Sequence, residues 1–171
     1  MTEPAAFAAR LTRQPIAYDR AAAEDTARDF ADLPPEVTGL LAATAGCAPF
    51  LKGLMQREGA WLRPALSVAP ETAFAAILTE AAAPPDRLAS ALRQAKRRAA
   101  LLVALADLGG VWSLEQVTGA LTALADRAVD LGLQTLVADE IRRGKLPGAT
   151  ADDAATAAGM VAIAMGKMGA G

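Results

Sequence analysis

Histidine is absent from this 171-residue chain, and cysteine occurs once, at Cys47. Without imidazole side chains there is no serine or cysteine hydrolase triad, no histidine metal ligand and no histidine general base. A single cysteine cannot form an intramolecular disulfide, which is typical of a protein from a reducing compartment. Because no histidine can activate the thiol, Cys47 is interpreted as a small buried apolar side chain and not as a nucleophile.

Aromatic residues make up only 4% of the chain, and 44 of its apolar residues are alanines. Alanine favours helices strongly and strands weakly, which argues against a sheet-dominated fold. The other apolar residues are spread along the chain and the net charge is only −2, so a disordered chain and a general nucleic-acid binder are both disfavoured. The first residues lack the positive charge of a signal peptide, and every long uncharged run falls short of the ~18 residues that span a membrane. We therefore expect a helical, cytoplasmic protein.

Prolines and glycines divide the chain into helical segments. Short or medium helices are predicted over about 4–13, 19–31, 34–46, from 49 to just before Pro64, and 70–82. Two longer helices follow, one after Pro84-Pro85 and one after Gly109-Gly110. Their apolar residues recur at steps of three and four, which is typical of antiparallel bundle helices. Ser113 and Gln116 form a capping-box pattern at the start of the second long helix. The sequence thus predicts an all-α multi-helix bundle.

The chain changes character after Pro147. Residues 148–158 are small, acidic and alanine-rich, and we interpret them as a linker. Residues 160–165 form a short apolar run bounded by glycines, which is typical of a buried strand. Since a lone strand has no pairing partner, residues 159–171 are interpreted as the truncated start of a second domain after a helical domain over 1–147. We expect this strand stub to be poorly ordered, or to pack as helix or loop.

Gly166, Lys167 and Gly169 follow the expected strand. Glycines after a strand allow close approach of a phosphate, and a lysine adds positive charge. A P-loop is rejected because Met168 replaces the magnesium-binding hydroxyl and Gly159 lies too far upstream. From spacing alone, both a nucleotide-binding turn and a flexible end remain open.

Other polar groups receive mostly structural interpretations. The basic stretch could bind a phosphate or an anionic partner, but a solvated outer face of a bundle helix is favoured; it comprises Arg87, Arg93, Lys96, Arg97 and Arg98. The two tryptophans, Trp61 and Trp112, are interpreted as packing residues. Acidic neighbours occur as Glu24-Asp25, Asp139-Glu140 and Asp152-Asp153. Adjacent side chains on a helix point about 100° apart, so these pairs are assigned no catalytic or metal-binding role.

Several segments together resemble the N-terminal half of the bacterial glutamine synthetase adenylyltransferase/deadenylyltransferase family. The segments are Ala48-Pro49-Phe50-Leu51 with Leu54, Met55, Trp61 and Leu62; Leu92 to Arg98 running on to Asp107-Leu108-Gly109; Leu114 to Asp126; and Val161 to Gly169. The last segment is the most specific, because it is close to the family's strand and glycine-rich loop. The likeness covers nearly the whole chain.

The resemblance implies a two-headed nucleotidyltransferase that regulates nitrogen assimilation. One half attaches AMP to a tyrosine of glutamine synthetase, and the half resembled here removes it by phosphorolysis, yielding ADP, under control of PII signalling protein and glutamine. The resemblance also implies ATP and Mg²⁺ in the parent enzyme, with Gly166, Lys167 and Gly169 as nucleotide-binding residues. Ala170 and Gly171 depart from the family pattern, and the metal-binding carboxylates are expected beyond residue 171. No catalytic or metal-ligating residue is therefore assigned, and the chain alone is expected to be inactive.

Two other classes remain as alternatives. A stand-alone helical protein-interaction module fits the helical segments equally well, but leaves the terminal strand and glycines without a role. A helical transcription regulator is weaker, because residues 18–31 are net acidic where a basic recognition helix would be needed.

Overall fold

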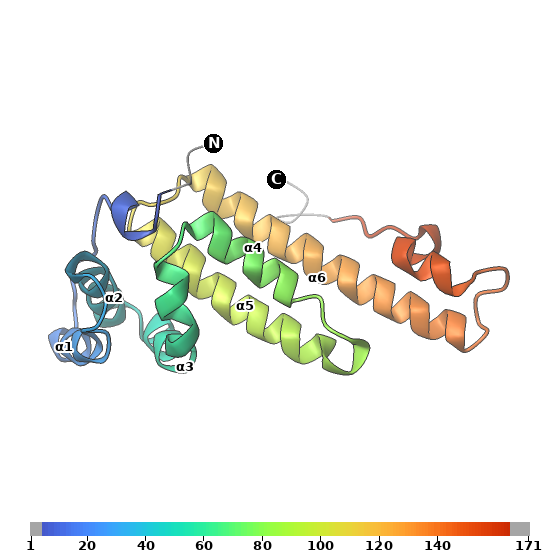
Figure 1. Ribbon diagram of the computed structural model, residues 1–171, viewed down its shortest axis with the longest axis horizontal. Coiled ribbons are helices and arrows are strands. Elements are labelled where there is room, and N and C mark those ends of the chain that lie inside the picture. Colours follow the sequence, from blue (N-terminus) through green and yellow to red (C-terminus); the bar gives the residue numbers. More distant parts are fainter. Residues whose placement is uncertain (1–4, 165–171) are drawn as a thin grey trace.

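The computed structural model describes residues 5–164, which form an elongated helical molecule with α4, α5 and α6 along its long axis (Figure 1). The elements are η1 (Ala8–Arg10), α1 (Arg20–Asp29), α2 (Pro35–Cys47), α3 (Pro49–Leu66), α4 (Pro70–Glu80), α5 (Pro85–Leu108), α6 (Leu114–Arg142) and η2 (Ala151–Gly159), where η denotes a 3₁₀ helix. No strand occurs among the described residues. The predicted all-α bundle is confirmed for this part of the chain.

Prolines define where four of the helices begin. Pro35, Pro49, Pro70 and Pro85 each occupy a first helical position, where the missing N–H costs nothing and the fixed φ suits the helix. The prediction that a helix ends before Pro64 was wrong, because α3 continues to Leu66. Pro64 lies in the last turn of α3, so its ring removes only one hydrogen bond there.

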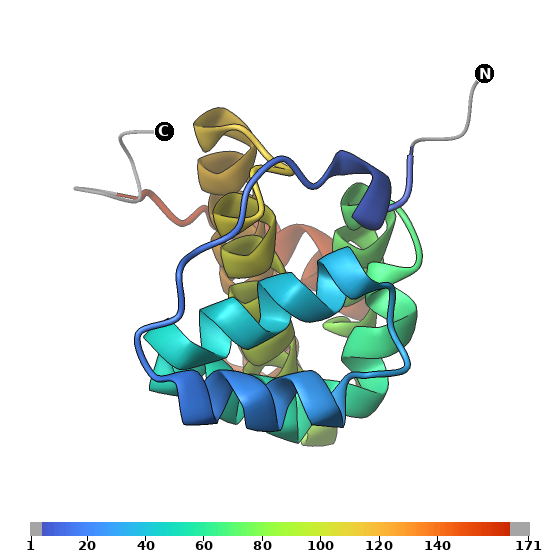
Figure 2. The same cartoon turned by 90° about the vertical axis from the view of Figure 1, so that its left-hand side faces the viewer.

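The long helices α5 and α6 form the spine of the molecule. They lie side by side, with α4 against α5, while α1, α2 and α3 gather at one end (Figures 1 and 2). The predicted capping box at the start of α6 is present: the Gln116 N–H donates to Ser113 Oγ at 3.4 Å, and the Ser113 N–H donates to Gln116 Oε1 at 2.9 Å. It satisfies two amide donors that a helix start leaves unpaired.

The hydrophobic core is centred on the C-terminal half of α5. Three leucines of this half are fully buried, at positions 101, 102 and 105. They belong to one core with fully buried residues of three other helices, namely Leu40 and Leu41 of α2, Leu62 of α3 and Ile77 of α4. Burying one such side chain contributes roughly 1.5–3 kcal/mol. In contrast, α6 has only two buried residues, Ala120 and Val137, so it lies along the edge of the core.

An extended N-terminal strap connects η1 with α1. It crosses the end of the bundle (Figure 2), where the N–H groups of Thr12 and Arg13 donate to the Gly109 carbonyl and the Asp19 N–H donates to the Gly46 carbonyl. The helix predicted over 4–13 is limited to the three residues of η1. The interpretation of Cys47 as buried was also wrong. Cys47 ends α2 beside the strap, is exposed, and donates its S–H to the Ile16 carbonyl.

The chain after α6 folds back on that helix. Most of residues 148–158, predicted to be a linker, belong to η2, which packs against α6. The described part of the predicted strand, residues 160–164, forms no helix or strand, and Val161 and Ile163 are exposed. No other strand is available among the described residues to pair with it. No helix within 5–164 has the length and apolarity that crossing a membrane requires.

Candidate functional site

A buried carboxylate links α3 to α5. The side chain of Glu58 is only 5% exposed, and its two oxygens accept hydrogen bonds from two consecutive arginines. Arg97 Nε donates to Oε1 at 2.8 Å, and Arg98 Nε donates to Oε2 at 3.1 Å. Arg98 also donates to Glu80 Oε2 of α4 at 2.6 Å and stacks over the Trp61 ring at 5.1 Å. We call these five residues the Glu58 cluster.

The electrostatics of the Glu58 cluster favour an ionised carboxylate. Burial alone would raise the pKa of Glu58, but the hydrogen bonds and positive charges of Arg97 and Arg98 outweigh it and hold the pKa below its ordinary value. Glu58 therefore carries a negative charge at neutral pH. Because its oxygens are engaged and it is buried, the cluster braces three helices instead of offering a general base.

A second carboxylate, Glu71 of α4, connects the N-terminal segment to the start of α6. Arg10 Nη1 donates to both of its oxygens at 2.8 and 2.7 Å, and the Trp112 indole N–H donates to Oε1 at 2.7 Å. Burial opposes ionisation of Glu71, yet the Arg10, backbone and Trp112 hydrogen bonds lower its pKa. Trp112 packs edge-on against Phe74 in the core, with ring centroids 6.1 Å apart. Trp61 is half-buried beside Arg98, so both tryptophans are packing residues as predicted.

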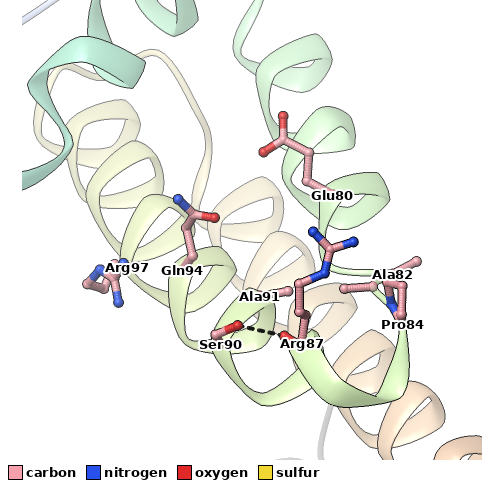
Figure 3. A pocket seen from close by; sticks show the side chains of 9 residues that line it. Glu80, Ala82, Pro84, Arg87, Ser90, Ala91, Gln94 and Arg97 are labelled. Atoms are coloured by element: carbon pink, nitrogen blue, oxygen red, sulfur yellow. Dashed lines mark hydrogen bonds between the residues drawn. The ribbon is translucent and has the colours of Figure 1, made fainter.

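A polar pocket of about 530 Å³ opens at the turn between α4 and α5. We call it the α4–α5 pocket; it is lined by Glu80, Ala82, Ala83, Pro84, Arg87, Ser90, Ala91, Gln94 and Arg97. Figure 3 shows the Arg87 guanidinium and the Gln94 amide reaching from α5 toward the Glu80 side of the pocket. The pocket shares Glu80 and Arg97 with the Glu58 cluster, which fixes one of its walls.

The chemistry of the α4–α5 pocket is that of binding. Ser90 donates its hydroxyl to the Arg87 carbonyl one turn earlier, so no base activates it (Figure 3). Arg87 pairs with no carboxylate among the described residues, whereas Glu80 is engaged by Arg98. The pocket thus offers a cation, an amide and a shared carboxylate to a polar ligand. It holds no set of residues for nucleophilic or acid–base catalysis.

An apolar groove runs between α5 and α6 and has a volume of about 350 Å³. We call it the α5–α6 groove; it is lined by Leu92, Arg93, Lys96, Leu121, Leu124, Ala125 and Ala128. Its floor is apolar, and its only charged residues are two cations. The groove and the α4–α5 pocket use different residues of α5.

The structure divides the basic stretch into two parts. Arg87, Arg93 and Lys96 are exposed, as the interpretation of a solvated outer face predicted. That interpretation was wrong for Arg97 and Arg98, whose side chains are 32% and 16% exposed and face Glu58. One signal could have revealed this: Glu58 lies four residues from both Leu54 and Leu62, on the apolar stripe of α3.

The remaining polar positions lie away from these sites. Asp25 and Asp139 pair with nearby basic side chains on or beside their own helices. No group of three or more potential metal ligands is found within 5–164. Gly166, Lys167 and Gly169, the predicted nucleotide-binding residues, lie outside the described residues.

Comparison with known proteins supplies the context for this geometry. The sequence model of the glutamate–ammonia ligase adenylyltransferase family matches residues 38–171. A bifunctional glutamine synthetase adenylyltransferase/adenylyl-removing enzyme from Rhodopseudomonas palustris is 38% identical over 187 aligned residues, covering 97% of this chain and 19% of that protein. The enzyme of the same name from Caulobacter vibrioides is 42% identical over 137 residues, covering 77% of this chain and 14% of that protein.

The chain therefore spans about a fifth, or less, of the length of these relatives. No solved structure is significantly similar to it. The family match begins in α2 and extends through the Glu58 cluster, both cavities and η2 to the last residue. With most of its length aligned to these enzymes at this identity, the chain belongs to the glutamate–ammonia ligase adenylyltransferase family.

Proposed function

We propose that this chain is the helical region of the adenylyl-removing half of a bifunctional glutamine synthetase adenylyltransferase. The observation that carries the proposal is the family match over residues 38–171, which includes most of α2, all of α3 to α6 and the terminal glycines. In the whole enzyme, the helical region positions the nucleotidyltransferase domain and contributes contacts to glutamine synthetase or PII signalling protein. The parent enzyme acts in the cytoplasm.

The chemistry belongs to the longer enzyme. Its reaction is phosphorolysis of the bond between AMP and a glutamine synthetase tyrosine, with phosphate as the acceptor and ADP as the product. Mg²⁺ would supply charge neutralisation for the phosphoryl groups. The described residues contain no group of three or more potential ligands for this ion. From the family pattern, its carboxylate ligands are proposed to lie beyond residue 171. Gly166, Lys167 and Gly169 are proposed to hold the nucleotide phosphates.

This proposal predicts that the 171-residue chain has no catalytic activity by itself. The test incubates the purified chain with adenylylated glutamine synthetase, phosphate and Mg²⁺, and measures ADP release. The Rhodopseudomonas palustris enzyme, incubated in parallel, is the positive control. We expect ADP only with the longer enzyme, and release of ADP by the chain alone would contradict the assignment of its catalytic residues beyond Gly171.

The gene that encodes the chain distinguishes the proposed enzyme from a stand-alone interaction module. We expect the reading frame to continue past Gly171 into Glu-Leu-Asn and then an Asp-x-Asp pair. A stop codon directly after Gly171 would favour the interaction module, and binding assays with glutamine synthetase would then replace activity assays.

A further inference from the structure

One side of α6 carries a row of exposed apolar residues. Leu114, Leu121, Val129 and Leu136 are 72%, 46%, 38% and 67% exposed. They recur every seven or eight residues, which is close to two helical turns, so they lie on the same side of α6. We call this row the α6 stripe. Single exposed apolar residues need no explanation, but an aligned row is typical of a docking surface.

The α6 stripe runs into the α5–α6 groove. Leu121 belongs to both, and Leu92 of α5 forms the opposite wall of the groove. The stripe residues are separated by small ones, Ala125 and Gly132, and a side chain built at Gly132 would meet nothing within 4 Å. Small residues between larger ones allow the backbone of another helix to approach closely. The shape therefore fits a helix lying along α6.

The charges at the edge of the groove specify the chemistry of that helix. Arg93 and Lys96 line the groove, and unlike Arg97 and Arg98 they form no ion pair with a described residue. An apolar helix with acidic residues along one side would match both the floor and the edge. We propose that the α6 stripe and the α5–α6 groove together bind such a helix, supplied by a part of the same enzyme polypeptide that lies outside these 171 residues.

The area of the surface favours an attached helix over a separate molecule. The stripe extends over 23 residues of α6, from Leu114 to Leu136, or about 33 Å, and is about one helix wide. A contact about 33 Å long and about 10 Å wide covers about 330 Å² of each partner. This falls below the roughly 1,200 Å² in total that stable complexes between separate proteins bury. A helix on the same polypeptide is present at an effective concentration of about a millimolar, so a small area suffices.

The remainder of the polypeptide is large enough to provide this helix. The relatives are more than five times as long as the chain. The last described residues, 160–164, run from η2 back in the direction of the start of α6 (Figure 1). The inference rests on the proposed function in one respect, namely that the chain is part of a longer enzyme.

The test measures how fast cysteines on the α6 stripe react with a maleimide. Cys47 is first replaced by serine, because it is exposed and would react. Leu121→Cys and Leu136→Cys are then introduced singly, with Gln56→Cys at an exposed position of α3 as the reference. Each is placed in the 171-residue chain and in the full-length enzyme that contains it. We expect both stripe cysteines to react about tenfold more slowly in the full-length enzyme than in the 171-residue chain, because the attached helix covers the stripe. The reference cysteine should react at the same rate in both proteins.

Charge reversal then tests the acidic side of the bound helix. Arg93→Glu combined with Lys96→Glu should restore fast labelling of Leu121→Cys in the full-length enzyme, whereas Arg87→Glu, outside the groove, should not. Equal labelling in the short and long proteins overturns the proposal. The proposal is also overturned if the stripe cysteines of the 171-residue chain react more slowly as its concentration rises, because a second copy would then cover the stripe. ADP release by the same full-length preparation tests the proposed function separately.

Discussion

Glu58 is the residue on which three helices converge. Its carboxylate sits on α3, it is bound by two arginines of α5, and one of these also binds Glu80 of α4. Moving a carboxylate out of water is costly, and this cost is offset only when partners satisfy its oxygens. In this structure both oxygens are satisfied, and the Trp61 ring covers Arg98. The cluster therefore fixes how α3, α4 and α5 are oriented more than it adds to net stability.

Replacing Glu58 by glutamine is expected to lower the free energy of unfolding by about 2 kcal/mol at pH 7, since Arg97 then loses its carboxylate partner and Arg98 keeps only Glu80. The effect depends on pH with a definite sign. Because the folded-state pKa of Glu58 lies below its ordinary value of 4.5, the stabilisation is present above that pH and is lost as the pH falls through the folded pKa. The difference between wild type and Glu58→Gln should thus be constant at neutral pH and shrink below about pH 4.5.

Urea unfolding at a series of pH values measures this difference. Glu24→Gln, at an exposed position of α1, is the control for removing a carboxylate as such and should leave the free energy of unfolding nearly unchanged. A loss that is the same at pH 7 and at pH 3 would show that glutamine disturbs the packing, and that the charge of Glu58 is unimportant.

At the scale of elements, the strap packs so closely against α2 at Gly46 that there is no room for a side chain. The Asp19 N–H donates to the Gly46 carbonyl at 2.8 Å, and a Cβ placed on Gly46 would lie 2.7 Å from the Asp19 carbonyl oxygen and 2.8 Å from Ala17 Cβ. The Asp19 oxygen is backbone and the Ala17 Cβ is directly attached to it, so neither atom can rotate away. Gly46 is required for close contact between the strap and α2.

Gly46→Ala is therefore expected to destabilise the protein by about 2 kcal/mol, because the strap must shift away from α2. Gly53→Ala is the matched control, since Gly53 lies inside α3 with nothing within 4 Å of its added Cβ. It should stabilise by about 0.5–1 kcal/mol through helix propensity. Thermal unfolding of both variants gives the comparison, and a Gly46→Ala protein as stable as wild type would mean that the strap is not held at this contact.

Most elements were predictable because their signals are local. Proline at a first helical position and the Ser113–Gln116 capping box depend on neighbouring residues only, and both predicted their helix starts correctly. The end of α3 was not predicted, because the cost of Pro64 depends on how few turns remain after it. The residues assigned to a linker form η2, whose packing against α6 is a tertiary contact that local composition does not encode.

The candidate sites were less predictable than the helices. The basic stretch was identified as a unit, yet α5 divides it among an ion cluster, a pocket and a groove. Which arginine turns inward depends on Glu58, almost forty residues away in sequence. The periodicity of α5 alone does not indicate which arginine has a buried partner. The signal lies in α3, where Glu58 interrupts the apolar stripe.

At the scale of the whole molecule, the chain consists of a well-packed bundle and an overhanging end, which is the distal half of α6 together with η2. The core lies among α2, α3, α4 and α5, whereas the distal half of α6 is joined mainly to η2 (Figure 1). Val137 and Ala157 are the fully buried residues of these two segments, at 3% and 5% exposure. The overhanging end therefore depends on η2, and the bundle does not.

A chain that ends after Lys145 should keep its bundle and lose order only in distal α6. Removing η2 uncovers Val137, which costs roughly 1.5–3 kcal/mol locally. Because that contact lies outside the core, the midpoint of thermal unfolding should fall by no more than about 4 °C. Hydrogen exchange should accelerate over about 132–142 and stay unchanged in α5. Val137→Ala in the full chain provides a milder version of the same local effect. Faster exchange throughout α5 would instead mean that η2 and the bundle unfold as one unit, and that the tail is an integral part of the helical domain.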